Sequence, residues 1–252
     1  MLRNDPAVRL VDARAEAAYR TAHLPGAVNL PARDLNAPVA GVRRLVGGEV
    51  LAARLRELGI GAGPVVIYGA RGGSDAAHVW WTLHAYGHAS VQLLDGGIEA
   101  WQAEGHPTTA EVRDHPEPEE PFTPALEDAR SIGLRELAAR LNDPDLVILD
   151  TRSPTEYHGV DVAAKRGGHV PGARLLPWEA ALGDDWRLKP EAELRERLEA
   201  VLGAPEVVTY CQSGVRAAHT YAVLKMLGHA NVRLYLESWG EWGNLDETPI
   251  AR

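Results

Sequence analysis

The chain has 252 residues, which is enough for one large domain or for two domains of about 100–150 residues each. Hydrophobic residues make up 45% and charged residues 24%, the proportions of a folded protein rather than a disordered one. Its 26 basic and 35 acidic side chains give a net charge of −9, so a nucleic acid partner is not expected. One cysteine cannot form an internal disulfide or a thiolate metal cluster, and the ten histidines show no metal-ligand spacing, so no metal is expected.

The sequence carries no sign of export or of a membrane span. Residues 1–6 include a basic residue but no apolar run behind it, so no signal peptide is predicted. No run of about 18 apolar residues occurs, so no membrane partner is expected. Together with the lone cysteine, these observations lead us to expect a cytoplasmic protein.

In chain order, short apolar segments alternate with amphipathic ones in the first half of the sequence. Residues 8–12, 65–68 and 91–94 are short, largely apolar and bounded by Gly, Pro or Asp, which predicts buried strands. Residues 48–58 and 76–86 carry apolar side chains three and four positions apart, which predicts helices. Strands that alternate with helices favour an α/β domain with a mainly parallel sheet and helices on both faces.

A polar segment then divides the chain. Residues 113–128 contain four prolines and many acids but little to bury, which predicts a stiff, solvated linker. We therefore expect an N-terminal domain over residues 1–112 and a C-terminal domain over residues 129–252. Because the linker allows both domains to pack within one chain, a monomer is expected.

The sequence after the linker repeats the plan of the first half. The segment LVDAR at residues 10–14 returns as ILDTR at residues 148–152, and HLPGA at residues 23–27 returns as HVPGA at residues 169–173. Further matched pairs are Asp5-Pro6 with Asp143-Pro144, Tyr19 with Tyr157, residues 65–68 with residues 207–210, and Trp101 with Trp242. The second copy has eight extra residues before its HVPGA segment. It also has a helix predicted at residues 132–141 before its first strand, whereas the first copy begins directly at that strand. Matched landmarks in one order indicate a duplicated α/β domain.

Residues that occur in both copies are expected to be structural. Asp150 and Arg152, like their counterparts Asp12 and Arg14, predict an ion pair beneath the loop that follows the central strand. His169, like its counterpart in the first copy, is expected to hold the Pro-Gly turn by hydrogen bonds.

The only cysteine occurs where an open α/β sheet places its sites. Cys211 follows the strand predicted at residues 207–210, and a helix is predicted at residues 217–227. The loop between them consists of Cys211, Gln212, Ser213, Gly214, Val215 and Arg216. Its backbone N–H groups and the start of the helix favour a thiolate, and Arg216 adds a positive charge. A lone cysteine is more often a buried small hydrophobe, but this position favours a nucleophile. The matching residue in the first copy is Gly69, which has no side chain to act as one.

Three nearby side chains are candidates for contacts with a substrate. Ser213 can hydrogen-bond the sulfur or the sulfur donor, or shape the loop. Arg216 can bind the anionic end of the donor or brace the loop. Arg166, within the eight-residue insertion of the second copy, can supply a second anion contact or lie on the surface as a solvated side chain.

The Cys211–Arg216 loop resembles the active-site loop of the rhodaneses, which are thiosulfate and 3-mercaptopyruvate sulfurtransferases. The paired His-x-Pro-Gly-Ala segments are similar to that family's N-terminal signature, residues 94–101 resemble its C-terminal signature, and residues 237–243 are a looser version. The resemblance implies two tandem rhodanese-like domains, of which the C-terminal one is catalytic. It also implies that Cys211 carries sulfur as a persulfide from a small anionic donor to a nucleophilic acceptor, cyanide or a thiol, without a cofactor.

Loop length and charge separate the activities that such a loop can support. Four residues lie between Cys211 and Arg216. The resemblance implies five in the related cysteine phosphatases, so a phosphatase is the weakest interpretation. Gln212 and Arg216 depart from the mercaptopyruvate branch, and residues 31–49 offer three arginines instead of that branch's histidine. Additional positive charge suits the dianion thiosulfate, which is the expected donor, with 3-mercaptopyruvate as the alternative. A sulfur-relay or interaction module without small-molecule turnover is a further alternative, because it can use the same loop.

Overall fold

The computed structural model describes residues 8–39 and 42–252, which form two compact units. Of the described residues, 8–37, 45–127 and 184–187 belong to the N-terminal unit, and 38–39, 42–44, 128–183 and 188–252 belong to the C-terminal unit. The repeat landmark Asp5-Pro6 and the start of the chain, in which no signal peptide is predicted, lie outside the described residues.

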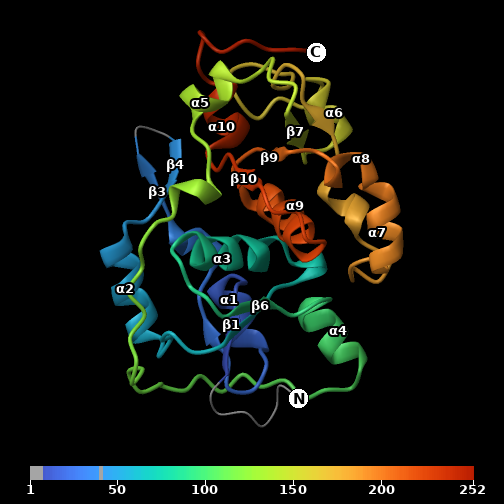
Figure 1. Cartoon of the computed structure of the whole chain (residues 1–252). Coiled ribbons are helices and arrows are strands. Elements are labelled where there is room, and N and C mark those ends of the chain that lie inside the picture. The colour runs from blue at the N-terminus through green and yellow to red at the C-terminus, as the bar shows by residue number, and fades with distance from the viewer. Residues whose placement is uncertain (1–7, 40–41) are drawn as a thin grey trace. The chain divides into compact units, whose positions relative to one another are not determined.

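The N-terminal unit is built on a parallel sheet with the strand order β2-β1-β5-β6. These strands are β1 (Arg9–Asp12), β2 (Val28–Asn29), β5 (Val65–Tyr68) and β6 (Val91–Leu93). The helices are α1 (Glu16–Thr21), α2 (Gly48–Glu57), α3 (Ser74–Ala85) and α4 (Gly97–Ala103), with short 3-10 turns at Ala32–Leu35 and Arg71–Gly73. Strands β3 (Asn36–Val39) and β4 (Val42–Leu45) form a separate two-stranded sheet. Figure 1 traces these elements from blue to green.

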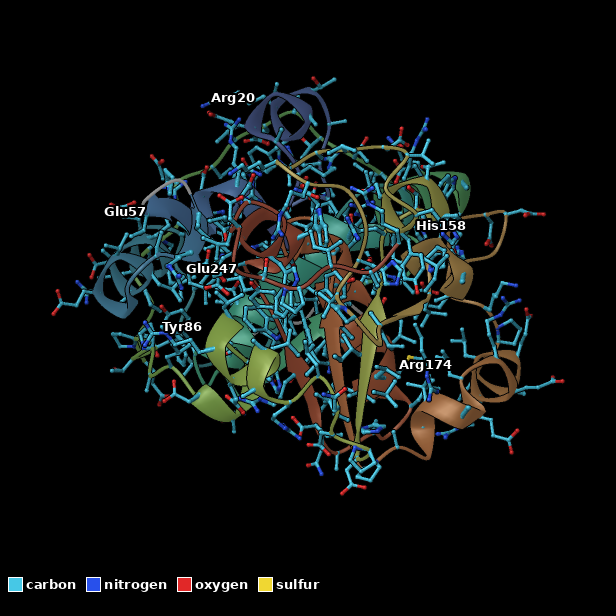
Figure 2. All side chains as sticks on the ribbon, turned by 90° about the horizontal axis from the view of Figure 1, so that it is seen from above. Arg20, Glu57, Tyr86, His158, Arg174 and Glu247 are labelled. Carbon is cyan, nitrogen blue, oxygen red and sulfur yellow. The ribbon has the colours of Figure 1, made fainter. Side chains whose placement is uncertain are left out.

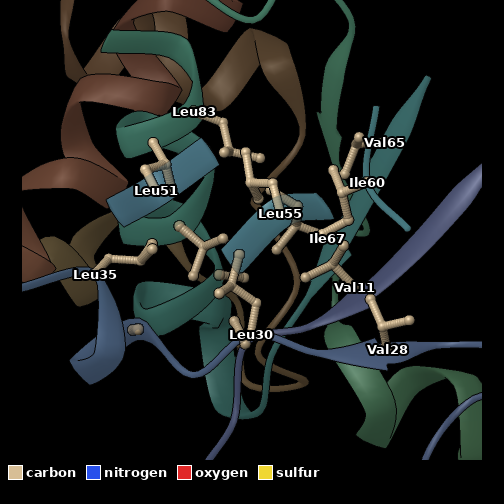
Figure 3. Packing of buried hydrophobic residues seen from close by; sticks show 14 of the residues in the cluster. Val11, Val28, Leu30, Leu35, Leu51, Leu55, Ile60, Val65, Ile67 and Leu83 are labelled. Atoms are coloured by element: carbon tan, nitrogen blue, oxygen red, sulfur yellow. The ribbon is translucent and has the colours of Figure 1, made fainter. Parts of the chain in front are cut away.

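Helices cover both faces of this sheet, as the alternation of strands and helices predicts. Val11 of β1 packs in a core cluster that also contains residues of α2 and α3 (Figure 3). Its neighbour Leu10 points to the other face and packs in a second cluster, which contains Trp101 of α4. In β5, Ile67 and Val66 divide between the two clusters in the same way. Charged residues such as Arg20 and Glu57 project from the outside of the unit (Figure 2).

The C-terminal unit has the same strand order, β8-β7-β9-β10, and its sheet is also parallel. Its strands are β7 (Leu146–Asp150), β8 (Arg174–Leu175), β9 (Glu206–Tyr210) and β10 (Val232–Leu234). Its helices are α5 (Leu134–Ala139), α6 (Pro154–Tyr157), α7 (Glu191–Arg197), α8 (Glu199–Leu202), α9 (Val215–Met226) and α10 (Ser238–Trp242), with 3-10 turns at Asp128–Arg130 and Trp178–Ala181. The shared strand order confirms the predicted duplication.

Two details differ from the sequence-based expectations. Helix α9 begins at Val215 rather than at residue 217, so Val215 and Arg216 lie in its first turn. The segment predicted as a linker, residues 113–128, is largely exposed, but its residues up to Glu127 belong to the N-terminal unit. There Gly61 and Pro121 form an antiparallel bridge, and Ala62 donates its N–H to the carbonyl of Glu120 at 3.0 Å. Among the described helices, none combines the length and the apolar character that a membrane span requires.

The ion pair expected beneath the loop is present in both units. In the C-terminal unit, Arg152 binds the buried carboxylate of Asp150 with an Nη2–Oδ2 distance of 2.6 Å, and Tyr210 donates its hydroxyl to the same oxygen at 2.6 Å. Tyr210 in turn accepts the N–H of Val170 at 3.1 Å. Arg14 and Asp12 make the same 2.6 Å contact in the N-terminal unit. The pair therefore fixes the His-x-Pro-Gly segment to the sheet in each copy.

The paired histidines act together with a tyrosine. His169 stacks on Tyr157 with ring centroids 3.6 Å apart, and its Nδ1 lies 3.0 Å from the Tyr157 carbonyl oxygen. Tyr157 donates its hydroxyl to the carbonyl of Ala173, at the end of the Pro-Gly turn, at 2.8 Å. The tyrosine thus holds the turn directly, and the histidine holds the end of the helix that carries the tyrosine.

Candidate active site

Cys211 lies at the carboxyl end of the central strand β9 and is 1% exposed. The loop after it turns sharply into α9 at Gly214, whose φ is +81°. A Cβ atom at this position would lie 2.7 Å from the carbonyl oxygen of Leu236, closer than packed atoms approach. Gly214 is therefore required both by its left-handed backbone and by its contact with the neighbouring segment.

The backbone after β10 fixes the first two residues of the loop. Trp239 donates its N–H to the carbonyl of Cys211 at 3.0 Å, and Gly240 donates to the carbonyl of Gln212 at 2.8 Å. Within the described part of the chain, none of the N–H groups of residues 212–216 donates a hydrogen bond to another protein group. These free donors directly follow the cysteine, and such N–H groups bind anions.

Arg216 is held by a carboxylate that the sequence reasoning missed. Its Nη1 and Nη2 atoms contact the two carboxylate oxygens of Glu156 at 2.7 and 2.8 Å, which is a bidentate ion pair. Burial raises the pKa of Glu156, but hydrogen bonds from Arg216 and Ser153 outweigh it and lower the pKa to about 2. Burial lowers the pKa of Arg216, but contacts with Glu156 and with Cys211 raise it overall. Arg216 is thus a permanent cation that interacts with both groups.

A signal for Glu156 is visible in the sequence once the two copies are compared. Residues 153–156 read Ser-Pro-Thr-Glu, and Ser153 and Glu156 form a capping box at the start of α6. The positions that match Glu156 and Arg216 in the first copy are Ala18 and Ser74. Both members of the pair are therefore present only in the copy that carries the cysteine.

The other residues of the loop differ in their contacts. Gln212 donates its side-chain amide to the carbonyl of Ala163, in the insertion of the second copy, at 3.1 Å. Ser213 is half-buried beside it, and Val215 is half-buried at the start of α9. The structure therefore brings the insertion against the Cys211 loop, as the sequence alone does not show.

Arg166 is occupied by the C-terminal segment. Its guanidinium donates to the carbonyls of Trp242 at 3.2 Å and Thr248 at 3.0 Å, and also contacts the carbonyl of Leu245. These contacts fasten the insertion to the end of the chain, which is a bracing role. The anion contact expected of Arg166 stays a prediction.

Two of the three arginines expected to add positive charge are paired with carboxylates. Arg44 contacts Glu237 at 2.7 Å and Glu241 at 3.0 Å, so two carboxylates face one guanidinium. Arg33 pairs with its neighbour Asp34 at 3.4 Å. The expected surplus of positive charge is therefore not available from Arg33 or Arg44. The carboxylates that pair with Arg44 are distant in the sequence and become apparent only in the fold.

The cysteine-free copy is closely packed at the matching position. A Cβ atom at Gly69 would lie 3.3 Å from the Cβ of Ala76, which is tighter than ordinary packing. Gly97 packs so closely against this loop that a Cβ atom added to it would lie 2.3 Å from the Gly69 carbonyl oxygen. This loop has neither a nucleophile nor ready space for a side chain.

Comparisons with known proteins agree with this geometry. A model of the rhodanese-like domain matches residues 1–104 and 134–245. The chain is 35% identical to a thiosulfate sulfurtransferase of Corynebacterium glutamicum, over 97% of this chain and 85% of that protein. It is 37% identical to a thiosulfate sulfurtransferase of Azotobacter vinelandii, over 97% and 91%, and 34% identical to the sulfur carrier protein TtuD of Thermus thermophilus, over 98% and 92%.

Solved structures share the fold of the whole chain. The anaerobic ergothioneine biosynthesis enzyme of Chlorobium limicola superimposes with a TM-score of 0.88 at 22% identity, over 99% of this chain and 66% of that one. The chain thus spans about two thirds of that longer protein, and the likeness concerns the fold alone. The family model, the curated relatives and the duplicated parallel sheets agree: the chain belongs to the rhodanese family, carries two tandem rhodanese-like domains, and is a rhodanese-type sulfurtransferase.

Proposed function

We propose that the chain transfers sulfane sulfur from thiosulfate to cyanide or a thiol through a persulfide on Cys211. The observation that carries the proposal is the position of Cys211, at the end of β9 and followed by free N–H groups and by Arg216. The matching loop of the N-terminal copy has Gly69 instead, so catalysis is assigned to the C-terminal domain and a non-catalytic role to the N-terminal domain.

The reaction is a double displacement. The Cys211 thiolate attacks the outer sulfur of thiosulfate, a new S–S bond forms, and the old S–S bond breaks as sulfite leaves with its electron pair. The N–H groups of residues 212–216 stabilise the anionic persulfide by preorganised hydrogen bonds, with no cofactor. Cyanide or a thiolate then attacks the terminal sulfur, and the electron pair returns to Cys211 as the thiolate leaves. Arg216 and Ser213 are assigned to contacts with the donor.

The names of the relatives support thiosulfate as the donor, because several of them are called thiosulfate sulfurtransferase. The charge of the site adds less support than expected, since Glu156 neutralises Arg216 and the carboxylates of Glu237 and Glu241 face Arg44. The alternative donor 3-mercaptopyruvate, a monoanionic carboxylate, is therefore the control substrate. A cysteine phosphatase is disfavoured by the shorter loop.

One relative favours a second candidate function. The Thermus protein is named a sulfur carrier, which matches the idea of a relay module that passes sulfur between proteins. Such a module carries the same Cys211 persulfide but reacts slowly with small acceptors. A cytoplasmic location and a monomeric state stay predictions from the sequence.

Initial-rate kinetics test the proposal. We expect the wild-type protein to form thiocyanate from thiosulfate and cyanide with parallel double-reciprocal lines, and the Cys211→Ser variant to be inactive. Turnover by that variant would refute the mechanism. Faster turnover of 3-mercaptopyruvate than of thiosulfate would overturn the donor, and loading of Cys211 without turnover would favour the relay module.

A further inference from the structure

Ser238 has an unusual backbone conformation next to the cysteine. It is completely buried, and its φ of +57° lies in the left-handed region that favours glycine. Alignment of Trp242 with Trp101 pairs Ser238 with Gly97 of the N-terminal copy. Gly97 also has a φ of +57°, so both copies use the same backbone conformation here. Only the catalytic copy places a strained side chain at this position, and such strain is retained where it serves a function.

The hydroxyl of Ser238 binds the backbone of the cysteine. It donates its proton to the carbonyl of Tyr235 at 2.7 Å, so its oxygen is left to accept the N–H of Cys211 at 3.1 Å. A backbone N–H can only donate and a carbonyl oxygen can only accept, so the Ser238 hydroxyl is the acceptor in one of these hydrogen bonds and the donor in the other. Ser238 therefore links the turn after β10 to the first residue of the catalytic loop.

Comparison of the two copies separates this contact from the general architecture. The carbonyl of Cys211 accepts the N–H of Trp239 at 3.0 Å, and the carbonyl of Gly69 accepts the N–H of Ile98 at the same distance. The carbonyl contact is thus common to both copies. The side-chain contact to the N–H is specific to the copy with the nucleophile, because Gly97 has no hydroxyl to make it.

We infer that Ser238 is a positioning residue for Cys211: its hydroxyl draws the Cys211 N–H into the core and thereby fixes the direction of the sulfur toward the free N–H groups of the loop. This inference rests on the proposed persulfide chemistry. A purely architectural role does not explain the serine, since a glycine adopts this conformation without strain and the N-terminal copy folds with one. Without the hydroxyl, the buried N–H of Cys211 has lost its acceptor, and the loop is expected to shift to satisfy it.

Two substitutions separate the hydroxyl from the strain. Ser238→Ala removes the hydroxyl and keeps the strained Cβ, whereas Ser238→Gly removes both. In the full-length protein, both variants are expected to accept sulfur from thiosulfate about tenfold more slowly in a single turnover. Alkylation of Cys211 by iodoacetamide is expected to shift to higher pH in both, because the loop no longer holds the thiolate. The glycine variant is expected to be at least as stable as the alanine variant, so it remains informative if the latter fails to fold.

Thr209→Val is the matched control. It removes another buried hydroxyl of the same unit, one that donates its hydrogen bond to the carbonyl of Ala217 at 3.2 Å, whereas the Cys211 N–H donates to Ser238. The control is expected to keep the wild-type alkylation profile. Wild-type loading and alkylation by Ser238→Gly would overturn the inference. If thiosulfate loads neither the wild type nor any variant, the proposed donor is wrong. The pH profiles of Cys211 alkylation then still decide the role of Ser238.

Discussion

Replacing His219 by leucine tests the energetic cost of a buried imidazole behind the active-site loop. His219 lies in α9 with its ring edge-on to Trp178, at a centroid distance of 5.1 Å. Its Nδ1 atom is buried and has no hydrogen-bond partner among the described residues. Burial disfavours the charged ring and lowers the pKa of His219 from 6.5 to about 4.

The sign and size of the pH effect follow from this pKa. The unfolded chain takes up the His219 proton near pH 6.5, whereas the folded chain takes it up only near pH 4. The stability that the neutral ring contributes is therefore fully present above about pH 6.5 and is lost progressively as the pH falls toward 4. A pKa lowered from 6.5 to about 4 corresponds to roughly 3 kcal/mol of unfolding free energy.

Urea unfolding between about pH 4 and pH 6.5 measures this effect. The His219→Leu variant has no proton to bind at this position, so its unfolding free energy is expected to fall by roughly 3 kcal/mol less than that of the wild type across this range. A change in packing against Trp178 shifts the unfolding free energy by the same amount at every pH, so it leaves the difference in pH dependence intact. His158→Gln is the control, because His158 is exposed at the end of α6 (Figure 2), and it is expected to keep the wild-type slope. Equal slopes for His219→Leu and the wild type would refute the reasoning.

Two further substitutions test the frame of the loop. Glu156→Gln leaves the half-buried Arg216 without a counter-charge, and we expect a loss of roughly 1–3 kcal/mol in unfolding free energy and slower sulfur loading in a single-turnover assay. Unchanged stability and loading would contradict the bracing role of this ion pair. Gly214→Ala brings a Cβ within 2.7 Å of the Leu236 carbonyl oxygen. Gly172→Ala is the matched control, because φ is +80° there too but space is available for a Cβ, and we expect it to lower the unfolding free energy by about 1 kcal/mol. Thermal unfolding should show a clearly larger loss of stability for Gly214→Ala. Equal losses would show that the close approach at Gly214 is unimportant.

Much of the fold could be predicted because it depends on local patterns. The apolar strands at residues 8–12 and 65–68 predict a sheet buried on both faces, and Val11 and Leu10 do pack into separate cores. The paired landmarks predict two copies, and the strand orders agree. The predicted start of this helix at residue 217 lies two residues after the observed start of α9, because the sequence alone does not show that Val215 already has helical geometry.

The supports of the active site could be predicted only in part, because they depend on contacts between distant segments. Cys211 and its loop are visible as a motif, whereas Glu156 lies sixty positions from Arg216 and is recognised as its partner only in the fold. The conformation of Ser238 is equally hidden, since serine does not indicate a left-handed backbone. The place of Arg166 in the insertion predicts a contact with the substrate, but the sequence does not show that its guanidinium contacts carbonyls of the C-terminal segment.

The central claim, that Cys211 carries the transferred sulfur, is tested most directly by the intact mass of the protein after incubation with thiosulfate. We predict a gain of one sulfur atom in the wild type, its loss on addition of cyanide, and no gain in the Cys211→Ser variant. A sulfur adduct that persists in that variant, or that cyanide does not remove, would contradict the persulfide mechanism.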